Sequence, residues 1–186
     1  MRFWTIQKKI HIQQAVDGGL YVPDFRLSGT VGRDPRQKPL FDYLLRCFNT
    51  VNSCSVPGLV FTFLQAQGPE FGQIPDLKSF MSLMWKHEDV VKALWKYMNR
   101  PENVLVEMEV NEPFLNPLYI DFNDFCYLME PRTVMPPYTE GEGAHLEDLL
   151  AKGQIQVSPL PSGIIQGHLP FIRREQIVAT YPVFSL

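Results

Sequence analysis

The chain has 186 residues, 45% of them apolar and 20% charged, with a formal net charge of -3. This length and mixture suit one globular domain over residues 1–186, and the weak negative charge argues against a nucleic-acid partner. Three cysteines without dense spacing do not make a secreted disulfide framework, and no apolar run approaches the roughly 20 residues that span a membrane. The polar opening segment does not fit a signal peptide, so we expect a soluble cytoplasmic protein without a membrane partner.

The first half of the chain is predicted to alternate strands with helices. The Gly18-Gly19 pair supplies a left-handed end for the first helix, and Pro39 suits the first turn of the second. The breakers Gly68, Pro69 and Gly72 indicate a loop. In chain order we expect a strand over 2–7, a helix over 8–17, a strand over 20–22, a loop over 23–38, a helix over 39–50, a buried strand over 59–65 and a loop over 66–75.

The second half contains the clearest strand pattern, at residues 104–110. Apolar side chains alternate there with Glu107 and Glu109, which predicts a central strand with one face in the core and the other at least partly wet. Pro182 indicates an edge position for the last strand. The expected elements are helices over 76–85 and 89–99, the strand over 104–110, a helix over 121–129, a loop over 131–143, a helix over 145–152, and strands over 155–157 and 177–184.

These elements predict an α+β fold in which helices flank a mixed or antiparallel twisted sheet. The apolar stripes of the helices and of the strand at 59–65 also predict that five large side chains share one core. The five are Leu44, Phe48, Phe61, Leu94 and Trp95.

Several segments resemble an uncharacterised bacterial and phage family of small proteins that open with a Trp-Thr-Ile-Gln strand. The segments are Trp4-Thr5-Ile6-Gln7, Gly18-Gly19-Leu20-Tyr21, Ile74-Pro75-Asp76-Leu77-Lys78, residues 104–110, Tyr119-Ile120-Asp121-Phe122-Asn123, Ile165-Gln166-Gly167-His168 and Glu175-Gln176-Ile177-Val178. They occur in the family's order and cover most of the chain. The family has no established activity to carry over.

The layout is also similar, more distantly, to the ADP-ribosyltransferase superfamily. This resemblance implies that Thr5 or Gln7 holds a nicotinamide nucleotide, that Tyr21 is the aromatic residue after the first helix, and that Gln166-Gly167 belongs to the late catalytic element. His168 then stands where the superfamily has its catalytic Glu. Because a neutral imidazole cannot supply that fixed negative charge, we predict that the chain does not transfer ADP-ribose by the usual mechanism.

Eight residues are candidates for ligand binding, and each also has a purely structural interpretation. Trp4, Thr5 and Gln7 line a nucleotide cleft, or else Trp4 anchors the core. Asp24 and Arg26 contact a phosphate or ribose, or else form a solvated pair in a loop. The full set is Trp4, Thr5, Gln7, Tyr21, Asp24, Arg26, Gln166 and His168.

Two pairs of carboxylates are candidates for acid/base chemistry or for binding a cation. Glu107 and Glu109 share a strand face, where paired carboxylates do acid/base work or simply mark a wet face. Asp121 and Asp124 bind Mg²⁺, or else cap a helix and face solvent. The cysteines and histidines show no zinc-ligand spacing, so we expect no metal and no cofactor.

The favoured functional hypothesis is a binding or interaction protein on a degenerate nucleotide-binding scaffold. Its partner would be a protein, with a small nucleotide as a second ligand class, and loops 66–75 and 131–143 would present the interface. The alternative is an active ADP-ribosyltransferase or related enzyme, with NAD as its cofactor. A deep polar cleft lined by Thr5, Tyr21 and a carboxylate would favour the enzyme, whereas a filled or apolar cleft would favour the binding protein.

Overall fold

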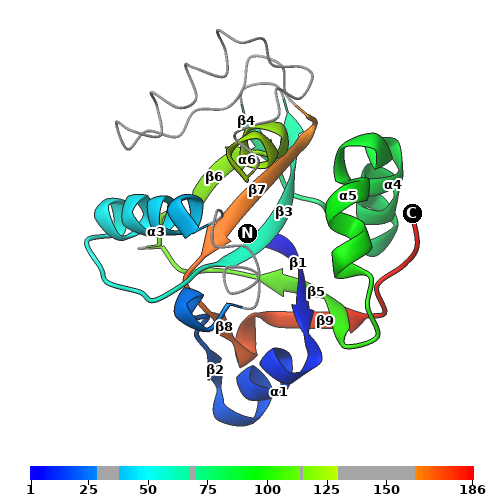
Figure 1. Cartoon of the computed structure of the whole chain (residues 1–186). Coiled ribbons are helices and arrows are strands. Elements are labelled where there is room, and N and C mark those ends of the chain that lie inside the picture. Colours follow the sequence, from blue (N-terminus) through cyan, green and yellow to red (C-terminus); the bar gives the residue numbers. More distant parts are fainter. Residues whose placement is uncertain (29–37, 68–69, 114, 130–161) are drawn as a thin grey trace, which may run out of the picture.

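A seven-stranded antiparallel sheet organises the described part of the chain, which comprises residues 1–28, 38–67, 70–113, 115–129 and 162–186 of a computed structural model (Figure 1). The strand order is β6-β7-β3-β1-β5-β9, with β4 paired to β3, and a second sheet contains β2 and β8. The strands are β1 (Arg2–Lys8), β2 (Leu20–Tyr21), β3 (Val60–Gln67), β4 (Glu70–Gly72), β5 (Asn103–Glu109), β6 (Leu118–Asp121), β7 (Ile164–Leu169), β8 (Ile172–Arg173) and β9 (Ile177–Tyr181). The expected α+β class is therefore confirmed.

Two helices have a clear cap at one end. Gly19, with φ of 79°, takes the left-handed conformation that ends the first helix. The carboxylate of Asp76 accepts a hydrogen bond of 2.7 Å from the backbone N–H of Ser79 and so starts another. The helices are α1 (Lys9–Gly18), α3 (Lys38–Asn52), α4 (Leu77–Lys86), α5 (Glu88–Met98) and α6 (Phe122–Met129), with short 3-10 turns at Phe25–Leu27 and Arg174–Gln176.

The helices pack on the sheet in three separate apolar clusters. Leu44 and Phe48 of α3 belong to the first, with Phe61 packed against it. Trp95 belongs to another cluster, under α4 and α5, with Leu94 packed against it. Figure 1 shows why: α3 and the α4–α5 pair lie at different ends of the sheet. The prediction of a single core for these five residues is therefore wrong.

The strand predicted over 104–110 is present as β5, and its second face is partly wet, as expected. It lies between β1 and β9, one strand in from the edge, so the middle of the sheet belongs to β1 and β3. Its second face is covered at Leu105, which is fully buried, and at Glu107, which is 6% exposed, but it is wet at Glu109. Alternation located the strand, but it gave no information on what covers the face that carries the carboxylates.

Two expected boundaries also change. Part of the predicted loop at 66–75 is strand β4, which pairs with β3 through Ala66 and Phe71. The last strand ends at Tyr181, and it is an edge strand, as Pro182 indicates. The predictions for 131–143, 145–152 and 155–157 lie outside the described residues. Among the residues described, none of the helices is long and apolar enough to cross a bilayer.

Candidate functional site

The most specific side-chain arrangement joins helices α4 and α5 to residues 182–186, which follow β9. Trp95 donates its indole N–H to the carbonyl oxygen of Phe184 at 2.8 Å, and Trp85 donates to the carbonyl oxygen of Ser185 at 3.3 Å. Asn99 donates to the hydroxyl of Ser185 at 3.5 Å. We call residues 182–186 the 182–186 segment, and its end runs beside both helices in Figure 1.

The ring of Phe184 lies among three aromatic side chains. Its centroid is 4.9 Å from that of Trp95, 5.7 Å from that of Trp85 and 6.1 Å from that of Phe80. Tilted and edge-to-face contacts at these distances stabilise aromatic groups beyond their area of burial. We refer to Phe80, Trp85, Trp95 and Asn99 as the α4–α5 aromatic face. It holds one aromatic side chain and two successive backbone carbonyl groups.

Trp4 connects the aromatic face to the sheet. Its ring stacks on Phe80, with centroids 5.0 Å apart, and on Tyr181, with centroids 6.0 Å apart. Its indole N–H donates to the carbonyl oxygen of Ile74 at 2.9 Å, and the side chain is fully buried. Trp4 is thus an anchor of the core, which is the structural interpretation considered for it above.

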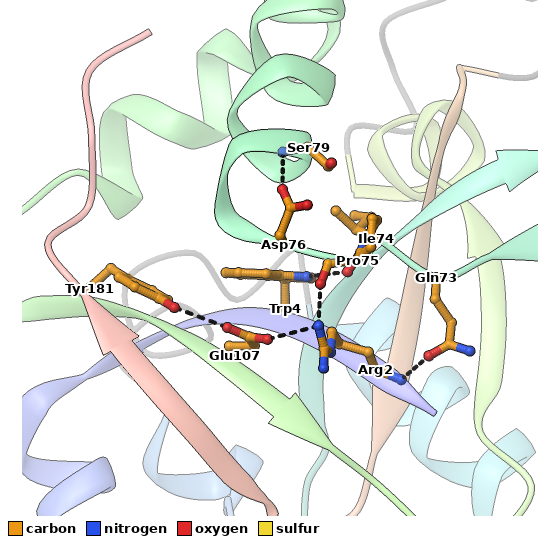
Figure 2. Close-up of polar contacts among 9 residues, drawn as sticks. All are labelled: Arg2, Trp4, Gln73, Ile74, Pro75, Asp76, Ser79, Glu107 and Tyr181. Carbon is orange, nitrogen blue, oxygen red and sulfur yellow. Dashed lines mark hydrogen bonds and ion pairs between the residues drawn. The ribbon is translucent and has the colours of Figure 1, made fainter.

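A polar group beside Trp4 fixes the end of β9 (Figure 2). Glu107 faces two partners: its Oε1 lies 3.2 Å from Nη1 of Arg2, and its Oε2 accepts a hydrogen bond of 3.0 Å from the hydroxyl of Tyr181. Arg2 also donates to the carbonyl oxygen of Pro75 through its side chain and to Oε1 of Gln73 through its backbone N–H, at 2.8 Å. Both oxygens of Glu107 are therefore engaged.

The electrostatics of this group favour a structural carboxylate. The hydrogen bond to Glu107, followed by desolvation and the nearby negative charge, raises the pKa of the Tyr181 phenol, so the hydroxyl remains a donor at neutral pH. The other carboxylate of the predicted pair, Glu109, is exposed. Glu107 and Glu109 consequently differ in environment and do not form a matched acid/base pair.

The residues that the transferase resemblance places at the start of the chain lie on one face of the sheet. Thr5 is fully buried, and its hydroxyl donates to the carbonyl oxygen of Phe61 at 2.6 Å. Gln7 donates to that hydroxyl oxygen at 2.9 Å. Tyr21 stacks on His11, with centroids 4.4 Å apart, and packs against the cluster that contains Phe3.

Gln166 and His168 lie on the opposite face of the sheet. Trp4 is paired with Phe63, and Phe63 with Gln166, so these three side chains share a face, whereas Thr5 is one residue out of phase. The structure therefore brings Thr5, Gln7 and Tyr21 to one face and Gln166 and His168 to the other. Their ligand-binding roles stay a prediction.

His168 is a buried neutral imidazole. Its Nδ1 lies 2.9 Å from the carbonyl oxygen of Leu118, and its Nε2 lies 3.1 Å from the position of Oε1 of Gln166. Desolvation lowers its pKa to about 4. Because a carbonyl only accepts, Nδ1 carries the hydrogen, and the Gln166 amide must then turn its NH₂ group toward Nε2.

Asp24 and Arg26, the remaining candidates for ligand binding, contact each other. Asp24 and Arg26 pair with each other at 2.6 Å within the loop, and the Arg26 side chain is 81% exposed. Hydrogen bonding from Arg26 lowers the pKa of Asp24. The two side chains thus pair within their own loop, with Asp24 17% exposed.

Asp121 and Asp124 are both fully buried, so neither is the solvated carboxylate that was considered. Asp121 accepts hydrogen bonds from the backbone N–H of Asn123 at 2.8 Å and from the N–H of Ser162 at 2.9 Å. Desolvation raises its pKa in spite of these donors. Asp121 therefore caps α6 and ties it to the start of β7. Over the described ranges, the side chains of His, Cys, Asp and Glu form no group of three or more that could hold a metal ion.

Sequence reasoning missed the aromatic face and the Arg2–Glu107–Tyr181 group. The sequence places Trp85 and Trp95 in helices, but their indole groups donate to residues that lie 100 and 89 positions later in the chain. The available signal was weak: Trp85 stands next to an apolar stripe without belonging to it, and it is 49% exposed.

Comparison with known proteins identifies no relative. No protein-family model matches the chain, and neither a curated protein nor a solved structure matches it. The functional argument therefore depends on the contacts within this chain.

Proposed function

We propose that this chain is a protein-binding module whose α4–α5 aromatic face binds an extended peptide segment. One observation carries the proposal: Trp85 and Trp95 donate to the carbonyl oxygens of two adjacent residues, while the ring of Phe184 lies between aromatic side chains. Sites that bind extended peptides combine the same two kinds of contact. Hydrogen bonds to the peptide backbone add affinity for any sequence, and an aromatic anchor adds selectivity.

The surface composition of α4 and α5 supports this role. Trp85 and Tyr97 are large apolar side chains that are 49% and 66% exposed. Aromatic residues, which combine a large apolar ring with a polar tip in Trp and Tyr, are enriched at protein interfaces. The prediction of a protein partner is kept, but its location moves from the loops at 66–75 and 131–143 to these two helices.

The geometry gives less support to an NAD-using enzyme. Thr5 is buried and bonded to Phe61, and Tyr21 shares its face, while Gln166 and His168 lie across the sheet. The buried carboxylate of Glu107, on the strand next to β1, has both oxygens engaged by Arg2 and Tyr181. We therefore propose the binding role, and we keep the absence of ADP-ribose transfer as a prediction with its own test.

The binding role is tested on the full chain with a Phe184→Ala substitution, which frees the aromatic face of its anchor. The probe is a fluorescently labelled, acetylated peptide with the sequence of residues 181–186, followed by anisotropy. We expect saturable binding. Replacing Phe by Ala in the peptide should weaken binding about tenfold or more, because burying a Phe side chain is worth about 1.5–3 kcal/mol.

A matched variant separates hydrogen bonding from ring contact. Trp95→Phe, added to Phe184→Ala, keeps a ring at position 95 but removes the indole donor to the peptide carbonyl. A lost hydrogen bond of about 1 kcal/mol predicts roughly fivefold weaker binding. Equal binding of the Phe and Ala peptides would contradict the proposed function.

A further inference from the structure

We propose that the 182–186 segment is a competitor in cis for the α4–α5 aromatic face, so that a partner's aromatic-bearing extended segment binds only in exchange for it. This inference rests on the proposed function and adds how the site is regulated and what it selects. The segment itself shows which chemistry the face accepts, namely two successive backbone carbonyl groups and a Phe side chain.

The segment lies outside the hydrogen-bonded strands of the sheet. Strand β9 ends at Tyr181, whose ring stacks on Trp4 and whose hydroxyl donates to Glu107. Pro182 comes next and has no backbone N–H, so it donates no hydrogen bond to the sheet ladder. Tyr181 is therefore the last residue held in the sheet, and the residues that a partner displaces begin at Pro182.

The segment also lies at the surface. Each of its five residues is exposed or half-buried, in contrast to Trp4 and Phe80, which are fully buried. Within the described part of the chain, its hydrogen bonds come from the side chains of Trp85, Trp95 and Asn99, all on or next to the two helices. Val183, Phe184 and Leu186 also pack against the apolar cluster that contains Phe80 and Trp95. A second peptide would have to supply the same backbone carbonyls, the ring and apolar neighbours to replace these contacts.

Covalent attachment makes the segment an effective competitor. A ligand joined by a very short linker has an effective concentration in the millimolar range. For a free peptide with a dissociation constant of about 100 µM, an internal competitor at about 1 mM reduces apparent affinity roughly tenfold. A partner must therefore carry a better anchor or bind a second surface.

The experiment compares the wild-type chain with the full-length Phe184→Ala variant, using the labelled peptide of residues 181–186. We expect the variant to bind the peptide about tenfold more tightly than the wild type. Phe184→Leu is the second variant: it keeps apolar bulk over Phe80, so the chain stays folded if alanine unfolds it, and it should give intermediate affinity. Circular dichroism checks the fold of each variant.

Three results would overturn the inference. If the wild type binds the peptide as tightly as Phe184→Ala, the face is a peptide site but the segment is no competitor, and the proposed function stands. If neither chain binds, the inference and the proposed function both fail. If the wild type sediments as a dimer below about 1 mM, and Phe184→Ala does not, the segment is exchanged between two copies and the competition in cis is wrong.

Discussion

At the scale of single residues, His168 couples stability to pH. It is fully buried and neutral, with a pKa lowered from 6.5 to about 4 by desolvation. Between these two values the unfolded chain binds a proton that the folded chain does not. Stability at neutral pH is therefore lost progressively as pH falls below 6.5, by about 3 kcal/mol at pH 4.

Urea unfolding at a series of pH values measures this loss. His11 and His87 also have lowered pKa values, mainly through desolvation, and titrate in the same direction. The control is therefore His168→Asn, whose amide can still donate to the carbonyl oxygen of Leu118. The stability of this variant should depend less steeply on pH than that of the wild type. If stability changes equally with pH in the two proteins, His168 is not the cause of the pH dependence.

At the scale of elements, Gly163 immediately precedes β7 and lies against His87, in the turn between α4 and α5. Its φ is +83°, and a Cβ there would lie 2.5 Å from Cε1 of His87. An alanine at this position must adopt a left-handed conformation and displace the imidazole. We expect Gly163→Ala to destabilise the fold by about 1–3 kcal/mol in urea unfolding.

Gly18→Ala is the matched control for this substitution. A Cβ at Gly18, the last residue of α1, meets nothing within 4 Å. Alanine is also the better helix former, so this variant should be neutral or slightly more stable. Equal effects of the two substitutions would show that the contact with His87 and the backbone conformation at Gly163 do not matter.

The sequence predicts elements well where the pattern is local. Alternation located β5, apolar stripes located α4 and α5, and Gly19 ended α1 as expected. Strand β7 was not found by periodicity, because both of its faces are buried and it carries Gln166 and His168 among apolar residues. Similarly, Gly68, Pro69 and Gly72 in the sequence favoured a loop where β4 pairs with β3.

The candidate site was harder to predict because its contacts are between distant segments. Glu107 was expected to mark a wet face, yet Arg2 and Tyr181 cover it from neighbouring strands. Nothing near Trp95 in the sequence indicates that its indole donates to Phe184. Local patterns predict which face of an element is apolar, but they do not predict which distant segment covers it.

At the scale of the whole molecule, the two faces of the sheet separate the residues that a transferase would need together. His168 lies with Gln166 on one face, among Phe61 and Phe125, whereas Thr5 lies on the other. Restoring the acid at position 168 therefore places it in a fully buried site across the sheet from Thr5. We predict that neither the wild type nor His168→Glu transfers ADP-ribose.

The test incubates both chains with labelled NAD and candidate protein or nucleic-acid acceptors, and it measures their unfolding over the same pH range. Burial raises the pKa of a carboxyl group, so in His168→Glu the folded chain keeps a proton that the unfolded chain loses. Its stability should fall as pH rises through the unfolded value of about 4.3, opposite to the wild type, whose stability falls as pH decreases. Labelling by the wild type would contradict the prediction, and labelling by His168→Glu alone would show that position 168 does reach a nucleotide site.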